Sequence, residues 1–319
     1  MVDRHRAAIH NSPITIHANA LRIWLQLFRA PNLFTVPGDP LAGYLLACYG
    51  TVEPLIALPV FASLSFYAVG LLLNDLADLA EDRAERPTRP LPSGAVSRAA
   101  VIVVMLALTA IGLVLCAIAG LWPLGVGVVL LIAIATYNLG MKRVPVVGAV
   151  NMGLCRGLSL LLGATVVPHG DLTIPLMLHG RLDHLVVAFL LVTLFIAAVT
   201  NLARFETKTA APGFAKWLPA AAIAGGMVNF VPMVNGPNRT STIALFLLAF
   251  FTSAQVAWQL TRDPQQPLPP MIGTLIRMLL IIQAAFCAAT GDVFGSIASA
   301  ILIVLWPVSR AVGKRFYAS

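Results

Sequence analysis

Long apolar runs dominate this sequence and constrain its fold more than any other feature. They lie at about 33–50, 54–79, 97–119, 121–138, 146–167, 184–205, 213–231, 241–261, 270–290 and 293–309. Most approach the roughly 20 residues that a membrane-spanning helix needs, and they are too continuous for the alternating strands of a membrane barrel. Only 11% of the residues are charged, against about 25% in average soluble domains. The sequence therefore predicts an all-α, polytopic membrane bundle of ten spans, or nine if the last two runs form one broken helix.

The chain reads as one integral membrane domain over residues 1–319, with the transmembrane bundle at 33–309. Residues 18–30 are predicted to form an amphipathic helix along the membrane surface, because their apolar and polar side chains fall on opposite faces. No cleavable signal peptide is indicated, since residues 1–17 are polar and no short apolar core follows them. The four cysteines lie inside apolar runs without metal or redox spacing, which indicates packing residues.

The distribution of positive charge predicts the orientation. With the N-terminus inside, 17 of the 21 Lys and Arg residues fall in inner segments or at the span ends beside them, whereas only Arg181 and Arg239 fall in outer loops. This bias is typical of a protein of the cell (cytoplasmic) membrane with its N-terminus in the cytoplasm. The net charge of +8 is therefore ascribed to the inner membrane surface, and no nucleic-acid partner is expected.

Acidic residues gather at the inner end of the second apolar run. Five of the 13 Asp and Glu residues lie there within eleven positions, namely Asp75, Asp78, Glu81, Asp82 and Glu85. The spacing of Asp75, Asp78 and Asp82 predicts that they share one helix face. Carboxylates stacked in this way repel one another unless a cation is present, and Mg²⁺ prefers such oxygen ligands together with substrate phosphates.

A basic, proline-rich loop follows the acids. Its Arg83, Arg86 and Arg89 suit bidentate recognition of phosphate oxygens. Prolines 87, 90 and 92 stiffen the loop and hold these arginines near the acids. The alternative interpretation is a charged cap at the membrane interface.

The stretch NDLADLAED at 74–82, followed by RPTRPLPSG, resembles the first Asp-rich motif of the UbiA superfamily of intramembrane prenyltransferases. FRAPNLFTVPGDPLAG at 28–43 resembles that family's first-span entry, and YNLGMKR at 137–143 resembles its basic loop after the fourth span. The resemblance implies a helical bundle whose cytoplasmic mouth binds an isoprenyl diphosphate through Mg²⁺, with the lipid tail running into the bilayer. An aromatic or other hydrophobic, lipid-like acceptor would then receive the isoprenyl group.

On this resemblance, each candidate residue has an expected role. The expected metal ligands are Asn74, Asp78 and Asp82, and the expected catalytic carboxylates are Asp75, Asp78 and Asp82. The residues expected to hold the phosphates are Arg29, Arg86, Arg89, Tyr137 and Lys142. For Tyr137 and Lys142 the alternatives are an interfacial anchor and an inside-facing surface charge.

The chain departs from the family where a second acidic motif usually follows the sixth span. The region reads TNLARFETKT at 200–209 and contains one acid, Glu206, beside Arg204; the missing acids fall at Ala198 and Leu202. One interpretation is that Arg204 supplies a fixed positive charge against the diphosphate. The other is a catalytically reduced protein that binds or moves a lipid or secreted metabolite across the membrane.

An arginine also interrupts the fifth apolar run. Arg156 lies about halfway along it, where a charge is costly and usually faces a cavity or a partner. It is expected to bind the acceptor or the diphosphate, with Asn151 as a further substrate-binding candidate, or else to pair with an interior acid. The segment MGLCRGLSLLLGA together with TNLARFET resembles the UbiA-like subgroup of ebo-type gene clusters.

Overall fold

A computed structural model describes residues 21–48, 54–166, 182–206 and 212–316 of the protein. Within these ranges the chain forms helices and turns and no strand, and nine of the helices are long and apolar enough to cross a membrane. The predicted all-α polytopic bundle is thereby confirmed. The prediction for residues 1–17 lies outside the described residues.

The helices have the following bounds. They are α2 (Ala30–Leu33), α3 (Gly38–Ala47), α4 (Ala57–Ala77), α5 (Leu79–Glu85), α6 (Arg98–Ala119), α7 (Leu121–Leu139), α8 (Val147–Ala164), α10 (Leu182–Ala203), α11 (Leu218–Phe230), α12 (Asn238–Arg262), α13 (Leu268–Ala289) and α14 (Val293–Phe316). A short 3₁₀ turn, η2 (Met141–Arg143), joins α7 to α8.

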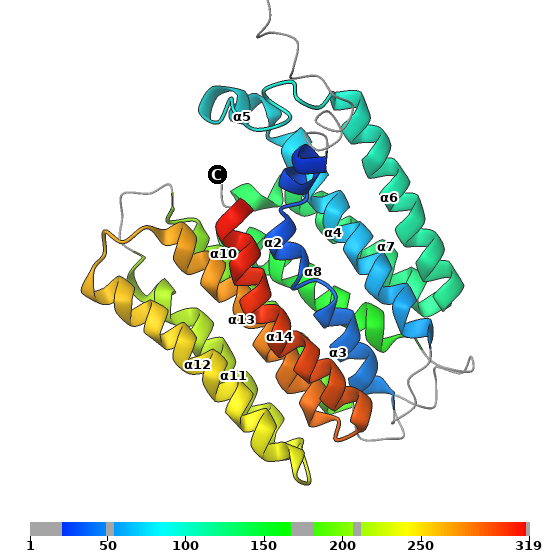
Figure 1. Ribbon diagram of the computed structural model, residues 1–319, viewed down its shortest axis with the longest axis vertical. Helices are drawn as coiled ribbons and strands as arrows, with labels where there is room; N and C mark the ends of the chain where they lie inside the picture. Colours follow the sequence, from blue (N-terminus) through cyan, green and yellow to red (C-terminus); the bar gives the residue numbers. More distant parts are fainter. Residues whose placement is uncertain (1–20, 49–53, 167–181, 207–211, 317–319) are drawn as a thin grey trace, which may run out of the picture.

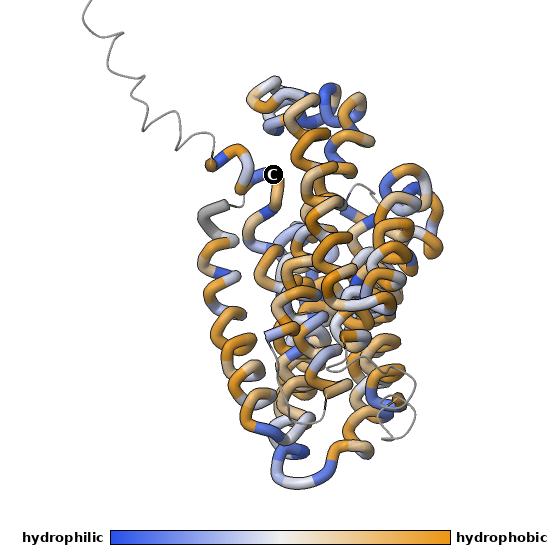
Figure 2. The backbone as a smooth tube through the Cα atoms, turned by 90° about the vertical axis from the view of Figure 1, so that its right-hand side faces the viewer, coloured by the Kyte–Doolittle hydropathy of each residue, from blue (hydrophilic) through white to orange (hydrophobic). Residues whose placement is uncertain are grey.

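The long helices pack side by side, with α6 and α7 at one edge of the bundle and α11 and α12 at the other (Figure 1). Helix α13 lies in the middle, where 78% of its most apolar stretch is buried, whereas only 17% of the corresponding stretch of α6 is buried. Exposed apolar residues on α6, such as Leu106 and Ile118, are what a lipid-facing surface requires. Figure 2 shows hydrophobic residues along the helices and hydrophilic ones mainly near their ends.

Two glycines bring α8 close to its neighbours. A side chain on Gly163 would collide with the backbone of Pro40 in α3, and one on Gly153 would collide with the backbone of Thr193 in α10. Small residues at helix crossings let two backbones approach in this way. Helix α8 is therefore held between α3 and α10.

The N-terminal region differs from its prediction. Residues 21–27 are helical, but Arg29 adopts a left-handed backbone conformation with φ 44° and interrupts the surface helix expected over 18–30; residues 18–20 lie outside the described part. Pro31 explains the interruption, because its ring would clash with the carbonyl four residues earlier in a continuous helix. Within the described residues 33–48, the longest helix is the ten-residue α3, which is too short to cross a membrane alone.

The last two apolar runs form two separate helices. The chain turns between α13 and α14 through Gly291, whose φ of 81° favours glycine. Near the other end of α14, the Ser309 hydroxyl donates to the carbonyl oxygen of Pro31 at 3.0 Å. The last helix thus returns to the N-terminal segment, and the two ends of the described chain lie on the same side of the bundle.

Candidate active site

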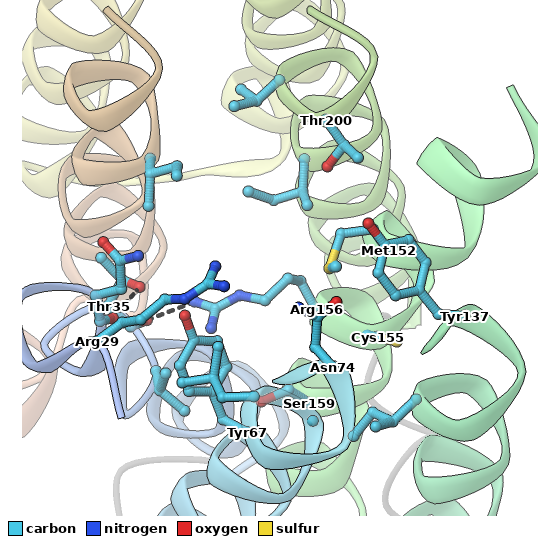
Figure 3. Close-up of a pocket in the computed structure, with 18 of the residues that line it drawn as sticks. Arg29, Thr35, Tyr67, Asn74, Tyr137, Met152, Cys155, Arg156, Ser159 and Thr200 are labelled. Atoms are coloured by element: carbon cyan, nitrogen blue, oxygen red, sulfur yellow. Dashed lines mark hydrogen bonds between the residues drawn. The ribbon is translucent and has the colours of Figure 1, made fainter. Parts of the chain in front are cut away.

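A cavity of about 400 Å³ lies between α4, α7, α8, α10 and α13. Its walls are mostly apolar, with Phe66, Leu130, Ile196 and Leu279 among the lining residues. Figure 3 shows polar side chains that point into it, among them Arg29, Asn74, Tyr137 and Arg156. We call the end that carries Asn74 and Glu206 the mouth.

The acidic motif lies at the junction of α4 and α5. Asp78 ends α4 and precedes α5, and its backbone leaves the helical region there. The backbone N–H of Asp82 still donates to the carbonyl oxygen of Asp78 at 2.8 Å. The expectation that Asp75, Asp78 and Asp82 share the face of one regular helix is therefore corrected: the helix is interrupted at the middle carboxylate, and α5 runs off at an angle to α4 (Figure 1).

Two cations from other segments pair with these carboxylates. Lys142, on η2, contacts Asp78 Oδ1 at 2.5 Å and donates to Asn74 Oδ1 at 3.2 Å. Arg89 Nη1 contacts both carboxylate oxygens of Asp82, at 3.0 and 2.8 Å, and Asp82 is only 4% exposed. The predicted proximity of the proline-rich loop to the acids is thus observed, and the YNLGMKR segment contributes to the same cluster.

Arg29 reaches the mouth from the N-terminal segment. It lines the cavity, and its charge acts on Asp75 and Tyr137. A left-handed conformation is uncommon in a residue other than glycine and persists only where the surroundings enforce it. Here it turns the chain so that α2 can begin, and it leaves the side chain over the cavity (Figure 3).

The end of α10 borders the mouth opposite the acids. Thr200, Ala203 and Glu206 line the cavity, whereas Arg204 does not; the Arg204 charge acts on Tyr137 instead. Burial raises the pKa of Glu206 above its usual 4.5, and the neighbouring charge of Arg86 opposes that rise. Arg86 thus acts on Glu206, while its backbone N–H donates to the carbonyl oxygen of Asp82 in the acidic cluster at 2.9 Å.

Asn151 does not reach the cavity. Its amide nitrogen donates to the carbonyl oxygen of Ala133 at 3.2 Å and to the Thr136 hydroxyl at 3.1 Å, both on α7. The residue is absent from the cavity lining, so the structure places it as a link between α7 and α8. This corrects its expected role in substrate binding, because its helix register points it at a neighbouring helix.

Arg156 pairs with an interior acid, which was one of the two interpretations of its sequence position. Its Nε lies 2.8 Å from Asp39 Oδ2, and its Nη2 donates to the carbonyl oxygen of Thr35 at 2.6 Å. Gln283 on α13 donates to the same carboxylate at 2.6 Å and to the same carbonyl oxygen at 2.9 Å. Arg156 nevertheless also lines the cavity.

Asp39 and Gln283 were not among the residues singled out from the sequence. A signal for Asp39 was present: it is the single charged residue in the run 33–50, as Arg156 is in the run 146–167. Two opposite charges, each alone in an apolar segment, are natural partners because neither is stable unpaired in the membrane. For Gln283 the sequence offers no comparable signal.

The oxygen groups at the mouth fit Mg²⁺ together with a diphosphate. Among the described residues, no three His, Cys, Asp or Glu side chains lie close enough to bind a metal by themselves. Mg²⁺, however, is usually bound by one or two carboxylates and completes its shell with water and substrate phosphates. Asn74, Asp78 and Asp82 supply only oxygen ligands, and each carboxylate retains acceptor capacity beside its single cation.

Comparison with known proteins gives a family match. The model of the UbiA prenyltransferase family matches residues 40–288. A digeranylgeranylglyceryl phosphate synthase from Sulfolobus acidocaldarius is 28% identical over 144 residues, which is 45% of this chain and 52% of that protein. The chain thus spans about half the length of the curated relatives that it matches.

Solved structures share the fold. A UbiA homologue from Aeropyrum pernix K1 has a TM-score of 0.62 at 20% identity, over 80% of this chain and 96% of its own. A UbiA homologue from Archaeoglobus fulgidus bound to GPP and Mg²⁺ has a TM-score of 0.61 at 15% identity, over 90% of this chain and 99% of its own. At such identities the likeness concerns the fold.

Proposed function

Because this chain belongs to the UbiA prenyltransferase family, we propose that it transfers an isoprenyl group, within the membrane, from an isoprenyl diphosphate to an aromatic or lipid-like acceptor. The family relative that was solved with GPP and Mg²⁺ bound supports the choice of donor. The segments 152–164 and 200–207 support assignment to the ebo-type subgroup.

One observation carries the proposal: an apolar cavity inside a membrane bundle ends in a cluster of carboxylates and cations. The apolar walls suit an isoprenyl chain, and the charged mouth suits its diphosphate. Arg29 and Lys142 supply positive charge from two different segments, so a diphosphate at the mouth meets cations on more than one side. Preorganised charge of this kind stabilises a leaving group as its negative charge builds.

Asn74, Asp78 and Asp82 would hold Mg²⁺, and Asp75 would support them. When bound, the ion would help to neutralise the diphosphate. Lys142 and Arg89 keep the carboxylates of Asp78 and Asp82 in place before substrate arrives. Arg29, Arg86, Tyr137 and Lys142 would contact the phosphate oxygens.

In the transfer, the bond between C1 of the isoprenyl group and the diphosphate oxygen breaks, and its electron pair leaves with the diphosphate. A nucleophilic atom of the acceptor forms a new bond to C1, and the acceptor then loses a proton. The apolar walls, which include Phe66 and Leu279, exclude water that would otherwise compete for C1. Arg204, whose charge acts on Tyr137, would supply the fixed charge that replaces a second group of acids.

We further propose that the protein lies in the cytoplasmic membrane with its N-terminus and its mouth inside. The positive charge of the inner segments supports this orientation. Cysteine labelling in intact cells tests it, since a probe that cannot cross membranes should modify Gly236→Cys and spare Ala84→Cys. The reverse pattern would place the mouth on the outside.

The activity is tested with purified protein, radiolabelled isoprenyl diphosphates and a lipid extract of the host, with Mg²⁺ or with a chelator. The expected result is Mg²⁺-dependent binding of the diphosphate and labelled product in the lipid fraction. If no isoprenyl diphosphate binds, the transferase assignment fails. The shortage of acidic residues at the end of α10 would then favour a protein that binds or moves a lipid or metabolite.

A further inference from the structure

A second polar group borders the cavity away from Asn74, and only part of it lines the cavity wall. It consists of Arg156, Asp39, Thr35 and Gln283 together with the hydroxyl pair Ser63 and Ser159, and we call it the buried polar tier. Arg156 lies about 12–14 Å from either end of α8, and Ser63 lies about 16 Å along α4 from Asn74, at 1.5 Å per residue. The tier therefore lies about halfway along α8 and well away from Asn74.

The charge of the tier is balanced within the protein. The carboxylate of Asp39 is fully buried, and both of its oxygens are engaged, one by Arg156 and one by Gln283. The carbonyl oxygen of Thr35 accepts from the same two side chains. One guanidinium and one carboxylate thus neutralise each other in a setting from which water is largely excluded.

Hydrogen-bonding capacity remains on the cavity side. Arg156 is only 7% exposed, lines the cavity, and finds no acceptor for its Nη1 among the described residues (Figure 3). The hydroxyls of Ser63 and Ser159 lie 2.5 Å apart, so one donates to the other and one hydrogen is left over. Leaving such donors unpaired among apolar walls costs free energy, which an oxygen atom of a ligand would recover.

We propose that the buried polar tier binds an uncharged oxygen, a hydroxyl or a carbonyl, of the prenyl acceptor. This inference rests on the proposed function, and it narrows the class of acceptor. An anionic group would lose its hydration at the tier and would gain little in return, because Asp39 already neutralises the charge of Arg156. A neutral oxygen accepts from Arg156 Nη1 without that cost.

The donor does not suit the tier. Its isoprenyl chain is apolar and would leave Nη1 of Arg156 unpaired, and its diphosphate needs more net positive charge than a neutralised pair supplies. Arg29 meets that need at the mouth, since no described carboxylate forms an ion pair with it. The cavity is thereby divided into a charged mouth for the diphosphate and a neutral tier for the acceptor.

The test uses two matched pairs of probes, titrated calorimetrically into the protein in nanodiscs. One pair is 2-naphthol and 2-naphthoate, and the other is 1-O-hexadecylglycerol and its 3-phosphate. In each pair the wild-type protein should bind the neutral member more tightly, by about tenfold or more. Tighter binding of the anionic members, or no saturable binding of any probe, would overturn the proposal.

The double variant Arg156→Met/Asp39→Asn tests the tier directly, because it removes both charges together and keeps the size of the side chains. It should weaken binding of the neutral probes about tenfold and leave the affinity for geranyl diphosphate with Mg²⁺ unchanged, which also reports that the fold is intact. Unchanged affinity for the neutral probes in this variant would contradict the proposal.

A second variant tests the charge balance itself. Asp39→Asn alone leaves the charge of Arg156 uncompensated, so the preference should shift towards 2-naphthoate; an unchanged preference would contradict the balancing role of Asp39. If this variant does not fold, the wild-type comparison and the double variant still decide the question. Failure of geranyl diphosphate to bind the wild type would instead refute the proposed function, so the two failures can be told apart.

Discussion

The ends of α4 and α10 border the same cavity, yet they carry opposite chemistry. The end of α4 leads into Asn74, Asp75, Asp78 and Asp82, and cations from η2 and from the proline-rich loop pair with two of these acids. The end of α10 and the residues just after it present Thr200, Ala203 and Glu206 to the cavity, and the charge of Arg204 acts on Tyr137. One side of the mouth is thus a preorganised carboxylate cluster, and the other is nearly without acids.

If a diphosphate binds at the mouth as proposed, the two sides are expected to act on it in different ways. Carboxylates bind it only through a cation, whereas an arginine contacts it directly and needs no metal. The proposed function therefore assigns one metal-dependent side and one side of fixed charge. The following predictions test that asymmetry.

The largest effect is expected at the acidic side. Asp78→Asn or Asp82→Asn should abolish Mg²⁺-dependent binding of an isoprenyl diphosphate, because each removes a charged oxygen ligand. Isothermal titration with and without Mg²⁺ measures this, and the protein should remain folded in detergent. Asp263→Asn, the same change at an exposed carboxylate between α12 and α13, is the control. Unchanged affinity in both site variants would remove the metal assignment.

Arg204→Ala tests the other side of the mouth. If Arg204 provides fixed charge, the variant should lose about 2–4 kcal/mol of diphosphate binding or of transition-state stabilisation, as when one preorganised donor is removed. Product formation and diphosphate affinity are the measurements. Arg262→Ala, which removes a guanidinium stacked over Trp258 at 3.9 Å, is the matched control. Intact binding and turnover would reduce Arg204 to a surface charge.

A third experiment adds acids at the end of α10, so that both sides of the mouth carry carboxylates. Acids placed on the cavity-facing positions, as Thr200→Asp and Ala203→Asp in the Arg204→Ala background, should restore Mg²⁺-dependent function by about tenfold. The positions inferred from sequence, Ala198 and Leu202, are buried at 7% and 0% exposure. Aspartates there should reduce the yield of folded protein, because they bury unpaired charge. Equal recovery of Mg²⁺-dependent function by both pairs of aspartates would contradict the structure, in which Thr200 and Ala203 of α10 face the cavity.

The smallest effect is expected at Glu206, whose negative charge opposes a diphosphate at the mouth. Glu206→Gln should strengthen diphosphate binding less than about fivefold at neutral pH, since the group is partly exposed. Because burial raises the pKa of Glu206, the wild-type side chain becomes neutral as the pH falls through that raised value, and the two proteins should converge there. Glu85→Gln, at an exposed residue outside the cavity, is the control. A difference that persists at low pH would argue against a charge effect.

Much of the fold could be predicted from the sequence, because whether a segment enters the membrane depends on its own composition. The long helices and the separate acidic and basic clusters are properties of contiguous residues. Errors arose where the backbone is irregular. The surface helix is interrupted at Arg29, and α4 ends at Asp78, because local geometry at these points depends on a nearby proline and on packing.

The candidate site was predicted less completely. Its acids and its arginines could be identified because they cluster in sequence, whereas the role expected of Asn151 could not be judged without knowing which way its helix faces. The partners of Arg156 are far from it along the chain, at Asp39 and Gln283. A residue list contains no information about which of several buried groups will meet.

The sequence by itself determined that the protein is a helical membrane bundle and that acids and arginines meet at one of its ends, since hydrophobicity and charge are local properties. Only the tertiary structure decided which charges pair: Lys142 with Asp78, Arg89 with Asp82, and Arg156 with Asp39. It also decided that the face of α10 towards the cavity carries Thr200 and Ala203. The physical reason is that pairing and exposure depend on how helices rotate and cross, and those angles are set by close packing between segments distant in sequence.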